Sequence, residues 1–238
     1  MAEVSSAQET AIYDAAAAHW WDDSLRWVRT LQAMVPARLA AFEAAGAEWA
    51  GRDVLDLGCA GGFMAEALAA RGARVEGIDP SADAIAAAKR HAGEARLDIG
   101  YRVGEGEALP YPDASFDAVV CVDVLEHVRD LGAVLAEVRR VLRPGGRFLF
   151  DTINRNALAT FAVVTVAERW LGLLPRGAHD PALFIRPADL RRALERLGFE
   201  VGRFGGLGPV GVGRRGDFRF GRHPGTAIIY HGTARKPD

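Results

Sequence analysis

The sequence is poor in cysteine and lacks both a secretory signal pattern and a long apolar run. Cys59 and Cys121 are its only cysteines, and both lie in apolar segments. This count excludes a disulfide framework and a multi-cysteine zinc site, and it suits a reducing compartment. No stretch reaches the roughly 18 to 20 uncharged apolar residues that span a bilayer. Residues 1–14 are polar and acidic, unlike a signal peptide. We therefore expect a cytoplasmic protein.

The sequence also lacks a strong excess of charge of either sign. It has 29 basic and 31 acidic residues, which gives a formal net charge of -2. A chain this close to neutrality has no overall field to hold a polyphosphate backbone, so nucleic acid is excluded as an expected partner. Half of the residues are hydrophobic and a quarter are charged, as in an ordinary globular protein. The 238 residues fit one large domain.

The hydrophobic pattern changes near residue 50. Before it, apolar residues recur at helical spacing, which predicts an N-terminal helical extension over residues 1–50. After it, short β-branched runs alternate with Ala-rich helical stretches, the pattern of a parallel sheet with helices on both faces. We therefore predict a doubly wound α/β domain over residues 51–238, with a mostly parallel seven-stranded sheet and a helical lid inserted at about 155–186.

The element boundaries follow from the same pattern. Strands are expected at 53–57, 74–78, 99–103, 117–122, 146–152, 199–204 and 227–234, and helices at 62–71, 81–92, 124–128, 131–142 and 187–197. Pro144, Gly145 and Gly146 predict a turn before the fifth strand. The residues after Gly205 predict only a loop that returns to the last strand.

The ends of the first four predicted strands carry residues suited to a nucleoside. In open α/β sheets, ligands bind at the carboxyl ends of the strands. A small-residue loop follows the first strand, a carboxylate that can accept hydrogen bonds from a ribose follows the second, an acceptor for a purine edge follows the third, and an apolar side chain follows the fourth. These candidate binding residues are Asp56, Gly58, Asp79, Glu105, Gly106 and Val122.

The glycine spacing argues against a dinucleotide. The loop reads Gly58, Cys59, Ala60, Gly61, Gly62, and so lacks the G-x-G-x-x-G pattern that binds a pyrophosphate. Asp56 would repel an anion and attract an ammonium. An NAD-dependent oxidoreductase is therefore disfavoured. Each element also has a purely structural alternative, because glycines permit close packing and Asp79 can cap the helix that follows it.

Several segments resemble known enzymes. VLDLGCAGG, VEGIDPS, GEGEALP and CVDVLEHV resemble the successive motifs of class I S-adenosylmethionine (SAM) methyltransferases. HWWD, PARLAAF, FDTINRN and GAHDPALFIRPADL resemble the polyprenyl-dihydroxybenzene O-methyltransferases of ubiquinone biosynthesis. The resemblance covers most of the chain and implies methyl transfer from SAM to a phenolic oxygen of a quinol precursor; whether the acceptor is prenylated stays open.

The resemblance assigns roles to four residues. It implies that Arg38 binds the carboxylate of SAM, that Gly58 lies against the cofactor, that Asp79 holds the ribose and that Val122 contacts the cofactor. A guanidinium suits a carboxylate, although Arg38 could equally belong to a solvated helix face. The chain departs from the family at Ala60, where glycine is usual, and at the position after Val122, where aspartate replaces the usual glutamate.

Asp123, Glu126 and His127 form the candidate catalytic cluster. Their spacing of i, i+3 and i+4 brings them together if a helix starts there. The resemblance implies that these three residues bind a divalent cation such as Mg²⁺, which would stabilise a phenolate. His127 could instead act as the general base, with Glu126 beside it. Asp123 and Glu126 also fit a helix-capping pair with no catalytic role.

The segment 157–174 is expected to form the lid. Phe161, Val164, Ala167, Leu171 and Leu174 fall on one helical face, and Thr165, Glu168 and Arg169 gather on another. The helix either covers the acceptor or lies in the membrane interface to meet a prenylated substrate, at the inner face of the membrane. His179, in the motif that follows, either orders the lid or approaches the acceptor.

Two rival functions remain at this point. A methyltransferase for another small phenol or natural product would keep the cofactor site and differ in the lid. A non-catalytic accessory protein would keep the pocket without turnover, and Ala60 is the only residue that favours it. The sequence does not determine the oligomeric state.

Overall fold

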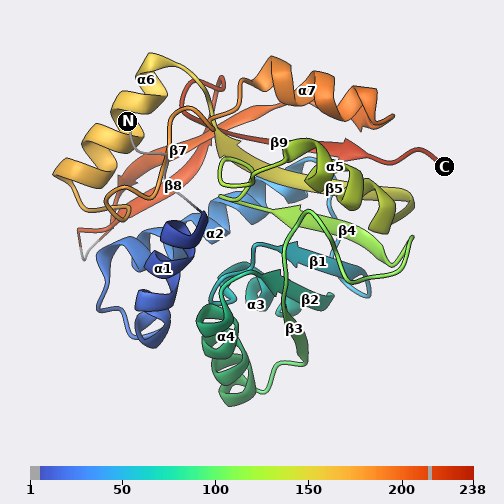
Figure 1. The fold of residues 1–238 in the computed structure, drawn as a ribbon, viewed down its shortest axis with the longest axis horizontal. Helices are drawn as coiled ribbons and strands as arrows, with labels where there is room; N and C mark the ends of the chain where they lie inside the picture. Colours follow the sequence, from blue (N-terminus) through green and yellow to red (C-terminus); the bar gives the residue numbers. More distant parts are fainter. Residues whose placement is uncertain (1–5, 214–215) are drawn as a thin grey trace.

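The computed structural model describes residues 6–213 and 216–238, which fold around one mixed β-sheet (Figure 1). Within these ranges the sheet has nine strands, in the order β3-β2-β1-β4-β5-β9-β7-β8, with β6 paired to β9. The strands are β1 (Asp53–Leu57), β2 (Arg74–Asp79), β3 (Ile99–Val103), β4 (Phe116–Cys121), β5 (Leu142–Ile153), β6 (Glu200–Val201), β7 (Gly205–Val212), β8 (Phe218–His223) and β9 (Ile229–Arg235). The helices are α1 (Ser6–Ala16), η1 (Ala17–His19), α2 (Arg26–Ala44), α3 (Phe63–Ala69), α4 (Ala82–Ala95), α5 (Leu131–Val141), α6 (Ala157–Thr160), η2 (Phe161–Trp170) and α7 (Pro187–Arg196).

The first five strands run parallel, in the order β3, β2, β1, β4, β5. Their central members are almost continuous apolar runs, because helices cover them on both faces. In β4, for example, Val119, Val120 and Cys121 are fully buried. Parallel strands end at the same edge of a sheet, so the loops after β1, β2, β3 and β4 meet there.

Two apolar cores lie on opposite faces of the sheet. α2, α3 and α4 cover one face, where Phe42, Leu68 and Ile85 pack against β1 and β2. α5 and α7 cover the other, where Leu135 and Leu190 pack against β4 and β5. This arrangement confirms the predicted doubly wound α/β fold, whose N-terminal extension contributes α2 to one of the covering layers (Figure 1). Residues 1–5 of that extension lie outside the described residues. The division at residue 50 stays a prediction.

The predicted number of seven strands was too low, because the loop expected after Gly205 contains a hairpin. β7 and β8 pair antiparallel, and β7 also pairs with β9. Glycines and a proline interrupt the strand pattern of β7, and arginines interrupt that of β8. The hairpin is specified by its contacts with α2 and β9 rather than by local propensity.

The helix predicted at 124–128 is wrong. The segment forms a turn, in which the amide of His127 donates to the carbonyl of Val124 over 2.8 Å. Asp123 adopts a left-handed φ of +54°, whereas a helix N-cap is typically extended. The helix-capping pair expected of Asp123 and Glu126 is therefore absent from this segment.

Two further strand boundaries differ from the prediction. The strand expected at 199–204 shortens to Glu200–Val201, which pairs only with the end of β9. β5 begins at Leu142, so the expected turn at Pro144–Gly146 lies within the strand as an irregularity, and the register with β4 shifts there. Gly145 has a φ of +76°, which only glycine adopts without strain.

The lid segment is helical, but its turns are wider than predicted. α6 continues into η2, a π-helical stretch with i to i+5 hydrogen bonds. Val163 and Glu168, five residues apart, are its buried side chains. Phe161, which the α-helical pattern places on the apolar face, is 49% exposed, and Glu168, which that pattern places on the polar face, is 1% exposed.

Candidate functional site

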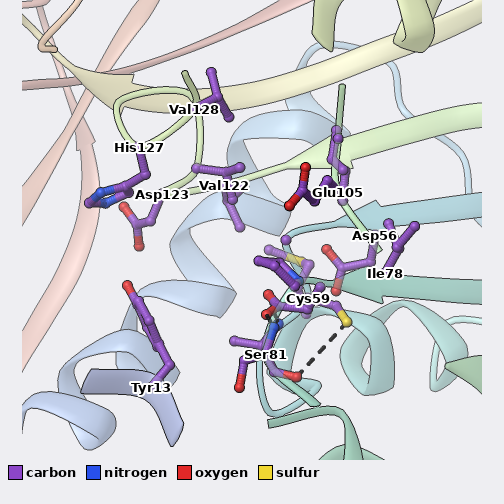
Figure 2. Close-up of a pocket in the computed structure, with 18 of the residues that line it drawn as sticks. Tyr13, Asp56, Cys59, Ile78, Ser81, Glu105, Val122, Asp123, His127 and Val128 are labelled. Carbon is purple, nitrogen blue, oxygen red and sulfur yellow. Dashed lines mark hydrogen bonds between the residues drawn. The ribbon is translucent and has the colours of Figure 1, made fainter. Parts of the chain in front are cut away.

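A cavity of about 230 Å³ lies at the carboxyl edge of the parallel strands. All seven residues predicted to bind the cofactor line this one cavity: Arg38, Asp56, Gly58, Asp79, Glu105, Gly106 and Val122. The loops after β1 to β4 form its floor, and α1, Trp20 and α2 close it from the N-terminal side (Figure 2). Asp123 and His127 also line it, so two of the three residues of the predicted catalytic cluster share the cavity with the predicted cofactor residues, whereas Glu126 does not line it.

Asp56 is a buried carboxylate at the end of β1. It is 1% exposed, and neither of its oxygens has a hydrogen-bond partner among the described residues. Burial raises the pKa of Asp56 to about 7. A buried carboxylate is costly unless it is paired. Its position in the cavity therefore fits a cationic ligand group, such as the ammonium of SAM.

Asp79 fixes the loop after β1. Its two carboxylate oxygens accept hydrogen bonds from the amides of Ala60 and Ser81, both at 2.9 Å. Burial raises the pKa of Asp79 to about 6. Carboxylate oxygens can each accept further hydrogen bonds, so both remain able to bind a ribose diol. The helix-capping alternative does not fit, because it is the Ser81 hydroxyl that accepts from the first turn of α4.

The glycine at position 58 has a structural reason that is independent of any ligand. Its φ is +75°, and a Cβ there would lie 2.2 Å from Cγ2 of Val124. The close-packing alternative therefore explains Gly58 by itself. Ala60 is strained at a φ of +43° and is held by the hydrogen bond from its amide to Asp79.

Arg38 is buried between two carboxylates. It is 3% exposed, its Nε donates to Asp151 over 2.6 Å, and its terminal nitrogen donates to Asp123. Burial opposes its charge, but Asp123 and Asp151 outweigh that effect, so the pKa of Arg38 is raised. A solvated helix face is thus the wrong interpretation of Arg38. Asp151 also accepts from the Asp123 amide, which holds the left-handed backbone there.

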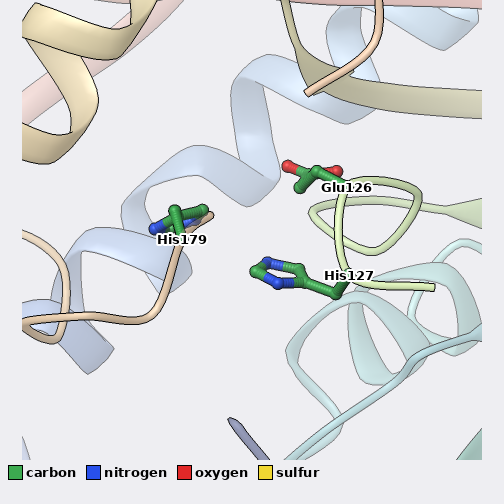
Figure 3. Close-up of side chains that lie close together, drawn as sticks. All are labelled: Glu126, His127 and His179. Carbon is green, nitrogen blue, oxygen red and sulfur yellow. The ribbon is translucent and has the colours of Figure 1, made fainter. Parts of the chain in front are cut away.

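The predicted cluster of Asp123, Glu126 and His127 is divided in the structure. Asp123 turns to Arg38, whereas Glu126 and His127 face His179 from the lid (Figure 3). The ligand atoms of Glu126, His127 and His179 all lie within 4.8 Å of one another. Glu126 accepts from the Thr152 hydroxyl over 2.7 Å, and burial raises its pKa to about 7.

Sequence reasoning missed four residues at the site. Tyr13 and Trp20 line the cavity from the N-terminal segment, and Tyr13 points toward Asp123 and His127 in Figure 2. Asp151 and Glu168 hold Arg38 and His179. Trp20 and Asp151 lie within the HWWD and FDTINRN motifs, so the signal was present but no role could be read from it.

The buried acids predict that cofactor binding depends on pH. SAM would pair with ionised Asp56, so below pH of about 7 its binding must expel a proton from this group. We expect the dissociation constant of SAM to fall up to about tenfold per unit as pH rises from about 5.5 to 7, and then to level off. Calorimetric titrations across this range measure it. Asp56→Asn should bind SAM weakly, and the dissociation constant of this variant should depend much less on pH. A pH dependence as steep as that of the wild type would contradict the pairing of Asp56 with the SAM ammonium.

Comparison with known proteins finds relatives that match over most of this chain. Residues 55–150 match the family described as a methyltransferase domain. The chain is 40% identical over 203 residues to the ubiquinone biosynthesis O-methyltransferase of Thiobacillus denitrificans, covering 84% of this chain and 86% of that protein. It is 37% identical over 242 residues to the protein of the same name from Methylobacterium sp. (strain 4-46), covering 97% and 95%.

Solved structures show the same fold. A SAM-dependent methyltransferase of Thermotoga maritima, described as a possible histamine N-methyltransferase, superposes with a TM-score of 0.66 at 18% identity. The match covers 95% of this chain and 99% of that one. This likeness extends to the architecture only.

Proposed function

Because this chain belongs to the ubiquinone biosynthesis O-methyltransferase family of SAM-dependent methyltransferases, we propose that it methylates a phenolic oxygen of a quinol precursor. The observation that carries the proposal is the single cavity, which joins the cofactor residues at the ends of β1 to β4 to Asp123 and His127. SAM supplies a methyl group on a sulfonium, which an oxygen nucleophile attacks in line. The chain's task is to hold both partners and exclude water.

The cofactor residues divide the proposed SAM site between them. Asp56 pairs with the ammonium, and Asp79 accepts from the ribose hydroxyls. Glu105 and Gly106 take the purine edge at the rim, and Val122 covers the cofactor. Arg38 binds the carboxylate, and its present bond to Asp123 must then be shared or released. Support comes from burial of both aspartates beside the same cavity.

The acceptor end lies beside His127. A phenol has a pKa near 10 in water, so its proton must be removed or its charge stabilised for attack. We assign proton transfer to His127, which lines the cavity, and assign to Glu126 the support of that end from the core behind it. The hydroxyl of Tyr13, on the opposite wall, would face the acceptor.

A divalent cation at the acceptor end of the cavity is the first detail of the proposal. The group that converges consists of Glu126, His127 and His179, and Asp123 is held by Arg38 instead. One carboxylate and two imidazoles suit Mn²⁺ or Zn²⁺ better than Mg²⁺, which prefers oxygen ligands. Bound there, the cation would stabilise a phenolate.

Contact of the lid segment with a membrane is the second detail of the proposal. In the described part of the chain, no helix is both long and apolar enough to cross a bilayer. The lid segment 157–174 nevertheless exposes Phe161 and Trp170, the latter by 67%. Aromatic side chains at this exposure suit a membrane interface that holds a prenylated acceptor.

We expect Phe161→Ser/Trp170→Ser to lower cosedimentation with anionic lipid vesicles several-fold, whereas Val210→Ser/Val212→Ser, at an exposed site in β7, should leave it unchanged.

The experiment that tests the proposed function is methyl transfer from labelled SAM to a panel of phenols. The panel contains prenylated catechols, short-chain catechols and unrelated natural-product phenols, with and without EDTA followed by Mn²⁺, Zn²⁺ or Mg²⁺. Turnover that is fastest on prenylated catechols supports the proposal. Preference for an unrelated phenol, or SAM binding without turnover on any acceptor, would overturn it in favour of the two rival functions.

A further inference from the structure

The lid carries a buried charged residue that the proposed chemistry does not use. Glu168 is 1% exposed and lies in the same helical segment as Val163, which packs with Ile153 and Phe184 in an apolar core. Burying a carboxylate in an apolar core costs several kcal/mol unless it is fully hydrogen-bonded. An apolar side chain would fill the same place more cheaply, so packing alone does not account for Glu168.

Both oxygens of Glu168 are used by one short loop. One lies 2.8 Å from Nδ1 of His179, and the other accepts from the amide of Gly177 at 2.8 Å. A carboxylate only accepts, so this contact places the ring proton of His179 on Nδ1. In the neutral ring Nε2 then keeps its lone pair, as a proton acceptor or a cation ligand.

The widened turns of η2 allow this contact. Positions five apart on an α-helix differ in direction by about 140°, so Val163 and Glu168 could not both face inward. In η2 both are buried, Val163 in the core and Glu168 on His179. π-helical turns often occur at functional sites.

His179 reaches the acceptor end from the lid. Its ring centroid lies 5.0 Å from that of His127, and its side chain is 7% exposed (Figure 3). Glu126 and His127 come from the turn after β4, whereas His179 comes from the loop after η2. The cluster is therefore complete only when the lid loop is folded against the sheet.

We propose that Glu168 is a positioning residue of the acceptor site, which fixes the His179 ring with Nε2 presented to Glu126, His127 and the phenolic acceptor. This inference rests on the proposed function, because it assigns the acceptor to that end of the cavity. It makes the lid a contributor to the chemistry as well as a cover. Removing a carboxylate that orients a metal-ligating histidine typically changes metal affinity or activity by about 10- to 100-fold, and we expect a loss of the same order here.

Glu168→Gln tests the proposal with little change in shape. The Gln amide would still accept from Gly177 but would donate to Nδ1 of His179, which moves the ring proton to Nε2. We expect kcat for the preferred phenol to fall at least tenfold, with the dissociation constant of SAM changed less than twofold. Glu168→Asp, which keeps the acceptor, should recover part of the lost kcat. Glu168→Gln/His179→Gln should be no slower than His179→Gln alone.

The chain offers a matched control in a second pair. Glu66 lies 2.8 Å from Nδ1 of His91, at a site between α3 and α4 that does not line the cavity. Glu66→Gln should change kcat less than twofold. An equal loss of kcat in both Glu-to-Gln variants would point to a merely structural role and overturn the proposal.

Side-chain ¹⁵N NMR of the full chain reports the tautomer of the His179 ring, and so tests the positioning role of Glu168 without measuring turnover. The wild-type spectrum should show His179, assigned by its loss in His179→Gln, as the Nδ1–H tautomer, and Glu168→Gln should convert it to the Nε2–H form. An unchanged tautomer overturns this inference even where methyl transfer occurs. Failure of the wild type to methylate any phenol overturns the proposed function, whereas the tautomer result still tests whether Glu168 fixes His179.

Discussion

Replacing Asp79 by alanine should weaken SAM binding by roughly 100-fold or more. The carboxylate is expected to accept two ribose hydroxyl bonds, and hydrogen bonds to charged groups contribute about 1.5 to 3 kcal/mol each. Its loss also frees the amides of Ala60 and Ser81, so the loop after β1 would relax from its strained form. Calorimetric titration of SAM at pH of about 7.5, where Asp79 is ionised, measures the effect.

Asp83 provides the control for this prediction. It lies four residues further on, exposed in the first turn of α4, and carries the same charge. Asp83→Ala should bind SAM within twofold of the wild type. Wild-type affinity in Asp79→Ala would contradict the assignment of Asp79 to the ribose.

Arg38→Met should lower the free energy of unfolding by about 3 to 5 kcal/mol, because it leaves buried Asp151 without its partner. Asp151 is fully buried, and burial already raises its pKa to about 6 even beside Arg38. Without the guanidinium, this carboxyl group must either remain charged in the core or take up a proton. Denaturant unfolding at pH of about 7.5 measures the loss.

A double variant removes the Asp151 charge that Arg38→Met leaves without a partner. Arg38→Met/Asp151→Asn should recover part of the lost stability, because Asn still accepts from the Asp123 amide and carries no charge. Arg52→Met, which breaks an exposed ion pair with Glu48, should cost less than about 1 kcal/mol. A loss as small as this in Arg38→Met would show that the buried ion pair does not stabilise the fold.

The part of the fold that sequence could predict is the part with strong local signals. The predicted bounds of β1 to β4 lie within a residue or two of the observed ones, because each strand is a short segment with β-branched or other apolar residues, bounded by turn residues or charged residues. Asp56 and Asp79 lie at the carboxyl ends of β1 and β2, and Glu105 follows β3, so correct strand positions also bring these three residues to one cavity. The local sequence pattern and the parallel topology are therefore enough to predict this part of the site.

The rest depended on contacts between distant segments. The β7–β8 hairpin is rich in glycine, its apolar spacing is interrupted in both strands, and it is held by α2 and β9. Asp123 takes its left-handed backbone from Asp151, 28 residues away, so no local rule predicts the missing helix. Glu168 looked like a surface residue because the pattern assumed 3.6 residues per turn, and η2 has wider turns.

A crystal structure with S-adenosylhomocysteine tests the central claim most directly. We predict the ribose hydroxyls on Asp79, the adenine at Glu105 and Gly106, and the amino-acid end between Asp56 and Arg38, with the sulfur facing the side of the cavity that holds Asp123 and His127. A ligand bound in any other place, or bound here with its amino-acid end directed away from Asp56, would contradict the account.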